Sequence, residues 1–151
     1  MTEVETPADM DALVGRPLGT SAWLTVTQAM IDRFADATGD HQWIHVDPVR
    51  AAREMPGGKT IAHGFLTLSL LPRLAQDIYR IRSRTRGINY GANKVRFTHP
   101  VQEGARVRLH LTLVASEKVE GGRRLTTANT VEIEGETRPA LVAETIALVF
   151  G

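Results

Sequence analysis

A nine-residue stretch from Gly39 to Asp47 concentrates acidic, imidazole and amide side chains that could do chemistry. Its polar side chains belong to Asp40, His41, Gln42, His45 and Asp47. An aspartate and a histidine five residues apart in a loop can converge on one point, where a carboxylate and an imidazole can activate water and return a proton. Asp40 and His45 are therefore candidate catalytic residues. The alternative is that Asp40 and Asp47 cap neighbouring helices while the histidines lie at the surface.

The same stretch raises the question of a metal site, because His41 and His45 form an i,i+4 histidine pair. Zinc sites with such a pair use an HExxH helix and a third ligand, and this chain has neither the motif nor a third ligand at recognisable spacing. Cysteine is absent, which excludes thiolate metal sites and cysteine nucleophiles. The chain also lacks the GxGxxG pattern of dinucleotide sites and the GxSxG elbow of serine hydrolases. We expect neither a metal nor a cofactor.

A second candidate lies at Ala62-His63-Gly64, where a long apolar stretch begins. The first N–H groups of a helix have no partner within the helix, and glycine lets a ligand approach the backbone closely. A carbonyl oxygen that gains negative charge during a reaction could be held there, as in an oxyanion hole. The alternative is that Gly64 only relieves crowding against a strand and that His63 is a hydrogen-bonded structural residue.

A third candidate is the segment Gly87–Lys94, which holds two glycines, two asparagines and a tyrosine just before a predicted strand. Asn89 and Tyr90 could line the mouth of a pocket, although the segment matches no phosphate-binding fingerprint. The alternative is a bulged entrance to the strand.

The composition limits the class of protein further. The chain has 151 residues, of which 42% are hydrophobic but only 5% aromatic, so a core of Ala, Val, Leu and Ile in one domain is expected. With 18 basic and 17 acidic side chains, it lacks the concentrated positive charge that nucleic-acid binding needs. No stretch approaches the roughly 20 apolar residues that cross a bilayer, and the acidic N-terminus does not resemble a signal peptide. We expect one cytoplasmic domain over residues 1–151 that binds neither nucleic acid nor membrane.

Besides one short helix around Asp9–Val14, three further helices are predicted. The first follows Thr27, a favourable N-cap, and ends at Gly39, which suits a left-handed C-terminal residue. A shorter one is predicted over Pro48–Arg53. The segment Ile61–Ile81 is apolar on nearly all sides, which predicts a long buried helix, and Pro72 predicts a kink or a local break in its hydrogen bonding.

Strands dominate the rest of the chain. The predicted strands are Gly19–Val26, Asn93–Phe97, Ala105–Ala115, Leu125–Ile133 and Pro139–Phe150. The last four alternate apolar and polar residues, as half-buried antiparallel strands do. An α+β domain follows, in which a curved sheet is wrapped against the apolar helix. One face of a small sheet cannot cover that helix on all sides, so a second copy of the chain is the simplest candidate to cover the rest.

The chain resembles a known family. Phe34–Pro48, together with Ala51, is similar to the hydratase 2 motif of the R-specific enoyl-CoA hydratases, also called MaoC-like dehydratases. Ile61–Phe65 resembles the start of the central helix in that family, and Asn93–Gly104 resembles the strand, turn and strand that follow it. The similarity spans about residues 18–150 and is nearest to the single-domain mycobacterial type.

The resemblance implies a hot-dog fold, in which a long central helix is wrapped by a curved antiparallel sheet, and a homodimer. It makes Asp40 and His45 the catalytic pair and assigns polarisation of a thioester carbonyl to the N–H of Gly64. The family often has Asn-Pro where this chain has Gln42-Trp43. The candidate substrate-binding residues are Gln42, Trp43, His63, Asn89 and Tyr90.

The implied activity is reversible, (R)-specific hydration of a trans-2-enoyl thioester in fatty-acid metabolism, with CoA or acyl-carrier protein as the carrier. Asp40 is expected to accept a proton from a water held with His45 while the water oxygen attacks C3, and His45 to return a proton to C2. Two alternatives stay open. A hot-dog acyl-CoA thioesterase would release free thiol, and a non-catalytic acyl-thioester binding subunit would bind without loss of enoyl absorbance.

Overall fold

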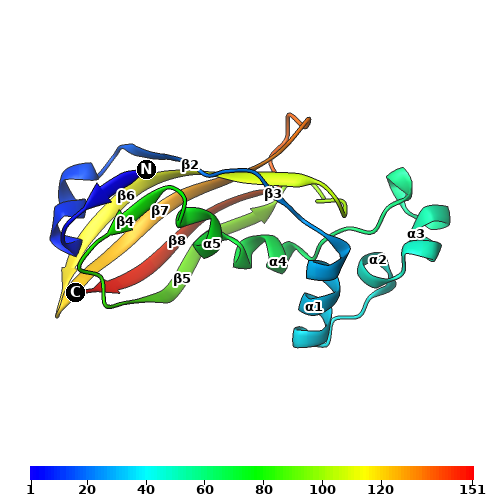
Figure 1. Ribbon diagram of the computed structural model, residues 1–151, viewed down its shortest axis with the longest axis horizontal. Helices are drawn as coiled ribbons and strands as arrows, with labels where there is room; N and C mark the ends of the chain where they lie inside the picture. The colour runs from blue at the N-terminus through cyan, green and yellow to red at the C-terminus, as the bar shows by residue number, and fades with distance from the viewer.

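A six-stranded antiparallel sheet forms the body of the protein in the computed structural model, which describes all 151 residues (Figure 1). The strands lie in the order β2 (Pro17–Thr20), β6 (Arg106–Val119), β7 (Gly122–Ile133), β8 (Leu141–Phe150) and β5 (Arg86–Phe97), and β3 (Leu24–Thr25) also pairs with β6. Alternation along β6 buries Val107, Leu109, Leu111 and Leu113 on one face. The period-two pattern therefore predicted this strand and its buried face correctly.

The two ends of the sheet differ from the prediction. The single strand expected over Gly19–Val26 is wrong, because regular pairing stops between Ser21 and Trp23 and the chain forms β2 and β3 separately. In this interval the Ser21 N–H donates to the Leu109 carbonyl, and the Ser21 hydroxyl accepts from the N–H of Leu109 at 2.9 Å. At the other edge β5 begins seven residues before the predicted Asn93, and its register shifts twice. The glycine-containing segment is thus a bulged strand.

The expected helix over Ile61–Ile81 is shorter than predicted, whereas the expected interruption at Pro72 is confirmed. Two short helices, α4 (Gly64–Ser69) and α5 (Leu71–Ala75), lie over one face of the sheet (Figure 1). They are separated at Leu70, since Pro72 has no N–H to continue the helical hydrogen bonds. The chain then becomes β4 (Tyr79–Ile81), which pairs in parallel with β1 (Thr2–Val4). An N-terminal partner distant in sequence therefore converts the end of the predicted helix into a strand.

The core lies between these helices, the sheet and η1 (Pro7–Leu13). Its largest wholly buried side chains include Met10, Ile31, Leu74, Ile78, Leu109, Leu113, Leu125 and Leu141. No aromatic side chain is among the buried residues, as the aliphatic composition predicted.

The remaining helices, α1 (Gln28–Thr38), α2 (Trp43–Val46), α3 (Pro48–Glu54) and η2 (Pro56–Gly58), lie beyond one end of the sheet (Figure 1). The N–H of Met30 donates to the Thr27 hydroxyl at 3.2 Å, and Gly39 has a φ of 78°, so both predicted ends of α1 are confirmed. The one-turn helix α2 was not predicted, because four residues are too few for a periodic pattern.

One side of the molecule leaves apolar groups exposed. Eleven of the twelve residues of edge strand β5 are exposed. The exposed large apolar side chains on this strand and the helix beside it are Phe65, Ile88, Tyr90 and Phe97. No helix is long and apolar enough to span a membrane.

Candidate active site

Asp40, His45 and His63 form one cluster at the junction of the helices and the sheet. Side-chain nitrogen and oxygen atoms from the three residues lie within 4.8 Å of one another. Asp40 directly follows the C-cap of α1, His45 lies in α2, and His63 directly precedes α4. The hydrogen bond between His63 and the backbone of Asp40 joins residues 23 positions apart in the chain.

His45 is held as a neutral base. Its Nδ1 lies 2.7 Å from the carbonyl oxygen of Ile61, which can only accept, so Nδ1 carries the hydrogen and Nε2 is left as an acceptor. Burial lowers the pKa of His45; the nearby His63 lowers it further, while the Ile61 carbonyl and Asp40 oppose the shift. The imidazole is therefore the deprotonated form at neutral pH.

His63 lies behind the other two residues. It is 3% exposed, its ring stacks on that of His45 with centroids 3.8 Å apart, and Phe34 covers another side at 4.9 Å. Its Nε2 donates to the backbone carbonyl of Asp40 at 3.0 Å, and Nδ1 is buried without a partner. The ring thus positions Asp40 and His45, and so little of it is exposed that direct contact with a ligand would be slight.

Asp40 differs from its neighbours. Its side chain is 55% exposed and lies 4.0 Å from His63 Nε2, where a ligand can reach it. His41, by contrast, pairs with Asp36 at the surface, 3.8 Å away. Asp47 caps α3 by accepting from the N–H of Arg50 at 3.0 Å. The capping alternative is thus correct for Asp47, and the surface alternative is correct for His41. Asp40 and His45 instead belong to the cluster.

Gln42 and Trp43 lie outside the cluster. Gln42 is exposed, and its N–H is 3.4 Å from a carboxylate oxygen of Asp40. The Trp43 ring is covered by the guanidinium of Arg50, 3.9 Å from its centroid. Gln42 can therefore help to orient Asp40 through its backbone, whereas its side chain forms no hydrogen bond in this structure.

Gly64 is the first residue of α4, so its N–H has no partner within the helix. A Cβ at this position would lie 2.9 Å from the Phe97 ring. The backbone here is therefore packed against β5, and glycine is required by that close approach.

The cluster offers one carboxylate and two imidazoles, the number of protein ligands in many catalytic zinc sites. The lone pair of an imidazole lies in the plane of its ring. Because the His45 and His63 rings are stacked with only 24° between their planes, their lone pairs do not aim at a common point. The geometry therefore does not fit a single metal ion, and the absence of a metal stays a prediction.

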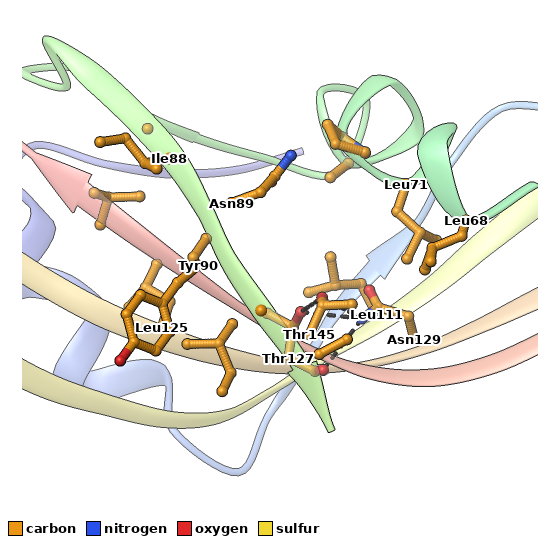
Figure 2. A pocket seen from close by; sticks show the side chains of 18 of the residues that line it. Leu68, Leu71, Ile88, Asn89, Tyr90, Leu111, Leu125, Thr127, Asn129 and Thr145 are labelled. Carbon is orange, nitrogen blue, oxygen red and sulfur yellow. Dashed lines mark hydrogen bonds between the residues drawn. The ribbon is translucent and has the colours of Figure 1, made fainter. Parts of the chain in front are cut away.

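A cavity of about 690 Å³ lies between α4–α5 and the inner face of the sheet (Figure 2). It begins on the helix side at Leu68, one turn beyond Gly64. Asn89 and Tyr90 line it, as do Thr127, Asn129 and Thr145, whereas Asp40 and His45 do not. Three predicted site residues therefore belong to the polar cluster and two to this cavity, whereas Gln42, Trp43 and Gly64 belong to neither. The volume of the cavity is typical of small-molecule sites.

The polar group in the cavity was missed by sequence reasoning. Thr127 and Asn129 occupy inward positions of β7, on the same face as Leu125 and Val131. Polar residues among the apolar residues of an inward face are the signal that could have revealed them.

Comparison with known proteins identifies the family of this chain. The model of the MaoC like domain matches residues 9–135. The chain belongs to the MaoC-like dehydratase family. The family and the hot-dog fold inferred from the sequence motifs are thereby confirmed.

Relatives of this MaoC-like protein are similar over nearly its whole length. 3-Hydroxyacyl-thioester dehydratase Z of Mycobacterium tuberculosis is 52% identical over 147 residues, which is 97% of each chain. Nodulation protein N of Rhizobium meliloti is 51% identical over 143 residues, 93% of this chain and 89% of that one. The solved (R)-hydratase from A. caviae shares the fold with a TM-score of 0.70 at 23% identity, covering 89% of this chain and 94% of its own.

Proposed function

We propose that this MaoC-like protein is a hydro-lyase of fatty-acid metabolism. It adds water to the C2=C3 double bond of a trans-2-enoyl thioester and removes it from the (R)-3-hydroxyacyl thioester. The 52% identity to a named 3-hydroxyacyl-thioester dehydratase over 97% of both chains supports this reaction class. The observation that carries the mechanism is the convergence of Asp40 and the neutral His45 at one point.

The protonation of His45 constrains the path of the proton. Neither the Asp40 carboxylate nor the Nε2 atom of neutral His45 carries a proton to give to the substrate. The proton that reaches C2 must therefore come from the attacking water. As the water oxygen bonds to C3, its O–H bond breaks toward the Asp40–His45 pair, and the pair returns that proton to C2 on the same face. Proton return by His45, as expected from the family, then requires Nε2 to receive the water proton first.

Gly64 supplies the other half of the mechanism. As the bond to C3 forms, negative charge moves onto the thioester oxygen. The free N–H of Gly64 can donate to this oxygen, and the absence of a side chain lets the Phe97 ring pack against the backbone at this point.

The cavity beyond Gly64 is proposed to hold the acyl chain, because most of its wall is apolar and it starts one helical turn away. The proposed carrier of the thioester is CoA or acyl-carrier protein. We also propose a homodimer, since a second copy placed against β5 would cover the exposed Ile88, Tyr90 and Phe97. We further propose that the protein acts in the cytoplasm.

Hydration of crotonyl-CoA tests the proposed function. We expect loss of the enoyl absorbance and formation of the (R)-3-hydroxybutyryl product, identified by chiral chromatography. A thiol reagent in the same mixture separates this reaction from thioester hydrolysis. Formation of the (S) product, or release of free CoA without loss of the double bond, would contradict the proposal.

The pH profile follows from the state of His45. Because its pKa is lowered, Nε2 stays available as a base below pH 6.5, the ordinary value for histidine, and is lost only when the ring is protonated at still lower pH. We expect kcat/KM for crotonyl-CoA to stay high as the pH falls through 6.5 and to decline below it. The variant His41→Gln, which alters an exposed histidine, should keep this profile. A rate that rises as the pH falls below 6.5 would mean that protonated His45 is the active form.

A further inference from the structure

The floor of the cavity carries a buried polar group beside apolar lining residues such as Leu111, Leu125 and Val149. Figure 2 shows the side chains of Thr127, Asn129 and Thr145 joined by hydrogen bonds, with Leu68 and Leu71 of the helices on the other side of the cavity. Asn129 is 2% exposed, and its position on β7 faces inward. A purely hydrocarbon ligand could form no hydrogen bond with such a group.

The donors and acceptors of this group can be counted. The two hydrogens of Asn129 Nδ2 have four acceptors in reach, among them the hydroxyl of Thr145 at 2.9 Å and that of Thr127 at 3.1 Å. The two hydroxyls also lie 3.1 Å apart, so one donates to the other. One hydroxyl hydrogen is then left over, and the Asn129 carbonyl oxygen receives no hydrogen bond from the protein.

The group thus presents one donor and one acceptor toward the cavity. A ligand hydroxyl is the complement of that pair, because it donates one hydrogen and accepts another. A plain alkyl chain would remove water from both atoms and leave them unpaired, which opposes its binding.

We propose that the cavity selects an acyl chain that carries a hydroxyl group remote from the thioester, bound by Asn129 and the Thr127–Thr145 pair. This substrate class rests on the proposed function, since the thioester end is placed at Gly64. The hydroxyl lies several carbons beyond C3, because the cavity starts one helical turn past Gly64 and the polar group lies across it on the sheet.

Binding of saturated acyl-CoAs tests this selection without any turnover. The probes are octanoyl-CoA and four octanoyl-CoAs with a single hydroxyl on the fifth, sixth, seventh or terminal carbon, titrated calorimetrically. We expect the wild-type protein to bind at least one hydroxylated probe about 10-fold or more tightly than octanoyl-CoA. A wild-type protein that prefers octanoyl-CoA to all four, or binds none of the five, overturns the inference.

Variants of the polar group test whether it causes the preference for a hydroxylated acyl chain. Asn129→Leu keeps the approximate shape but removes the amide, and should abolish the preference by weakening the hydroxylated probe while strengthening octanoyl-CoA. Thr145→Val should reduce the preference in the same direction, and it serves in place of the first variant if that one does not fold. Thr130→Val, on the same strand but outside the cavity lining, should keep the preference.

The variants also separate a structural role from recognition. If Asn129 only stabilised the sheet, its replacement would weaken all five probes alike, and that result would overturn the inference. Failure of crotonyl-CoA hydration would overturn the proposed reaction. The binding preference would still be tested, because calorimetry with saturated acyl-CoAs needs no turnover.

Discussion

Replacement of Asp40 by Asn, or of His45 by Gln, is expected to lower kcat/KM for crotonyl-CoA hydration by about 10²–10⁴-fold while the protein stays folded. Asn cannot accept the water proton, and Gln lacks the basic Nε2 of the imidazole. The fold should persist because the Asp40 side chain is 55% exposed and makes only peripheral contacts. Steady-state hydration rates and a thermal unfolding curve for each variant measure the two parts of this expectation.

The chain provides a matched control for this experiment. Asp36 and His41 are also an aspartate and a histidine five residues apart, and they lie 3.8 Å from each other at the surface. Asp36→Asn and His41→Gln should therefore keep nearly the full rate. A near-wild-type rate for Asp40→Asn or His45→Gln would show that the proton is transferred elsewhere.

The second large effect is expected from Ala147→Phe, which places an aromatic ring in the cavity. Ala147 lines the cavity from β8, opposite the helices. An octenoyl chain has four more methylene groups than a crotonyl chain, and each contributes about 0.8 kcal/mol when buried. If the ring displaces them, the ratio of kcat/KM for octenoyl-CoA to that for crotonyl-CoA should fall by about 10²-fold.

Both substrates are measured on the same preparation, so a general loss of stability cancels in that ratio. Val114→Phe is the control, because Val114 is 42% exposed on β6 and does not line the cavity. An unchanged ratio in Ala147→Phe would mean that the acyl chain binds outside the cavity.

Local signals in the sequence were sufficient for several elements. The helix α1 was predicted with both ends because Thr27 and Gly39 act within their own turn of backbone. The strand β6 was predicted because its alternation persists over many residues. The family motif was also local, since Asp40 and His45 lie within one short segment.

The errors arose where distant segments decide the structure. The apolar segment after Ile61 has the composition of a long helix, yet Tyr79–Ile81 became a strand because Thr2–Val4 pairs with it. The composition does not reveal such a partner. The early start of β5 likewise depends on pairing with β8, which outweighs the weak strand propensity of its glycines.

The sequence by itself determined the family and the aliphatic core, and it suggested the proposed acid–base pair, because these depend on residue type and short spacing. Only the tertiary structure decided that His63 lies behind that pair, that His45 is held with Nε2 free, and that Asn129 stands in the wall of a cavity. Each of these depends on contacts between segments far apart in the chain. The side chains alone specify what chemistry is available; the packing of the short helices against the sheet fixes where each group is placed and in which protonation state.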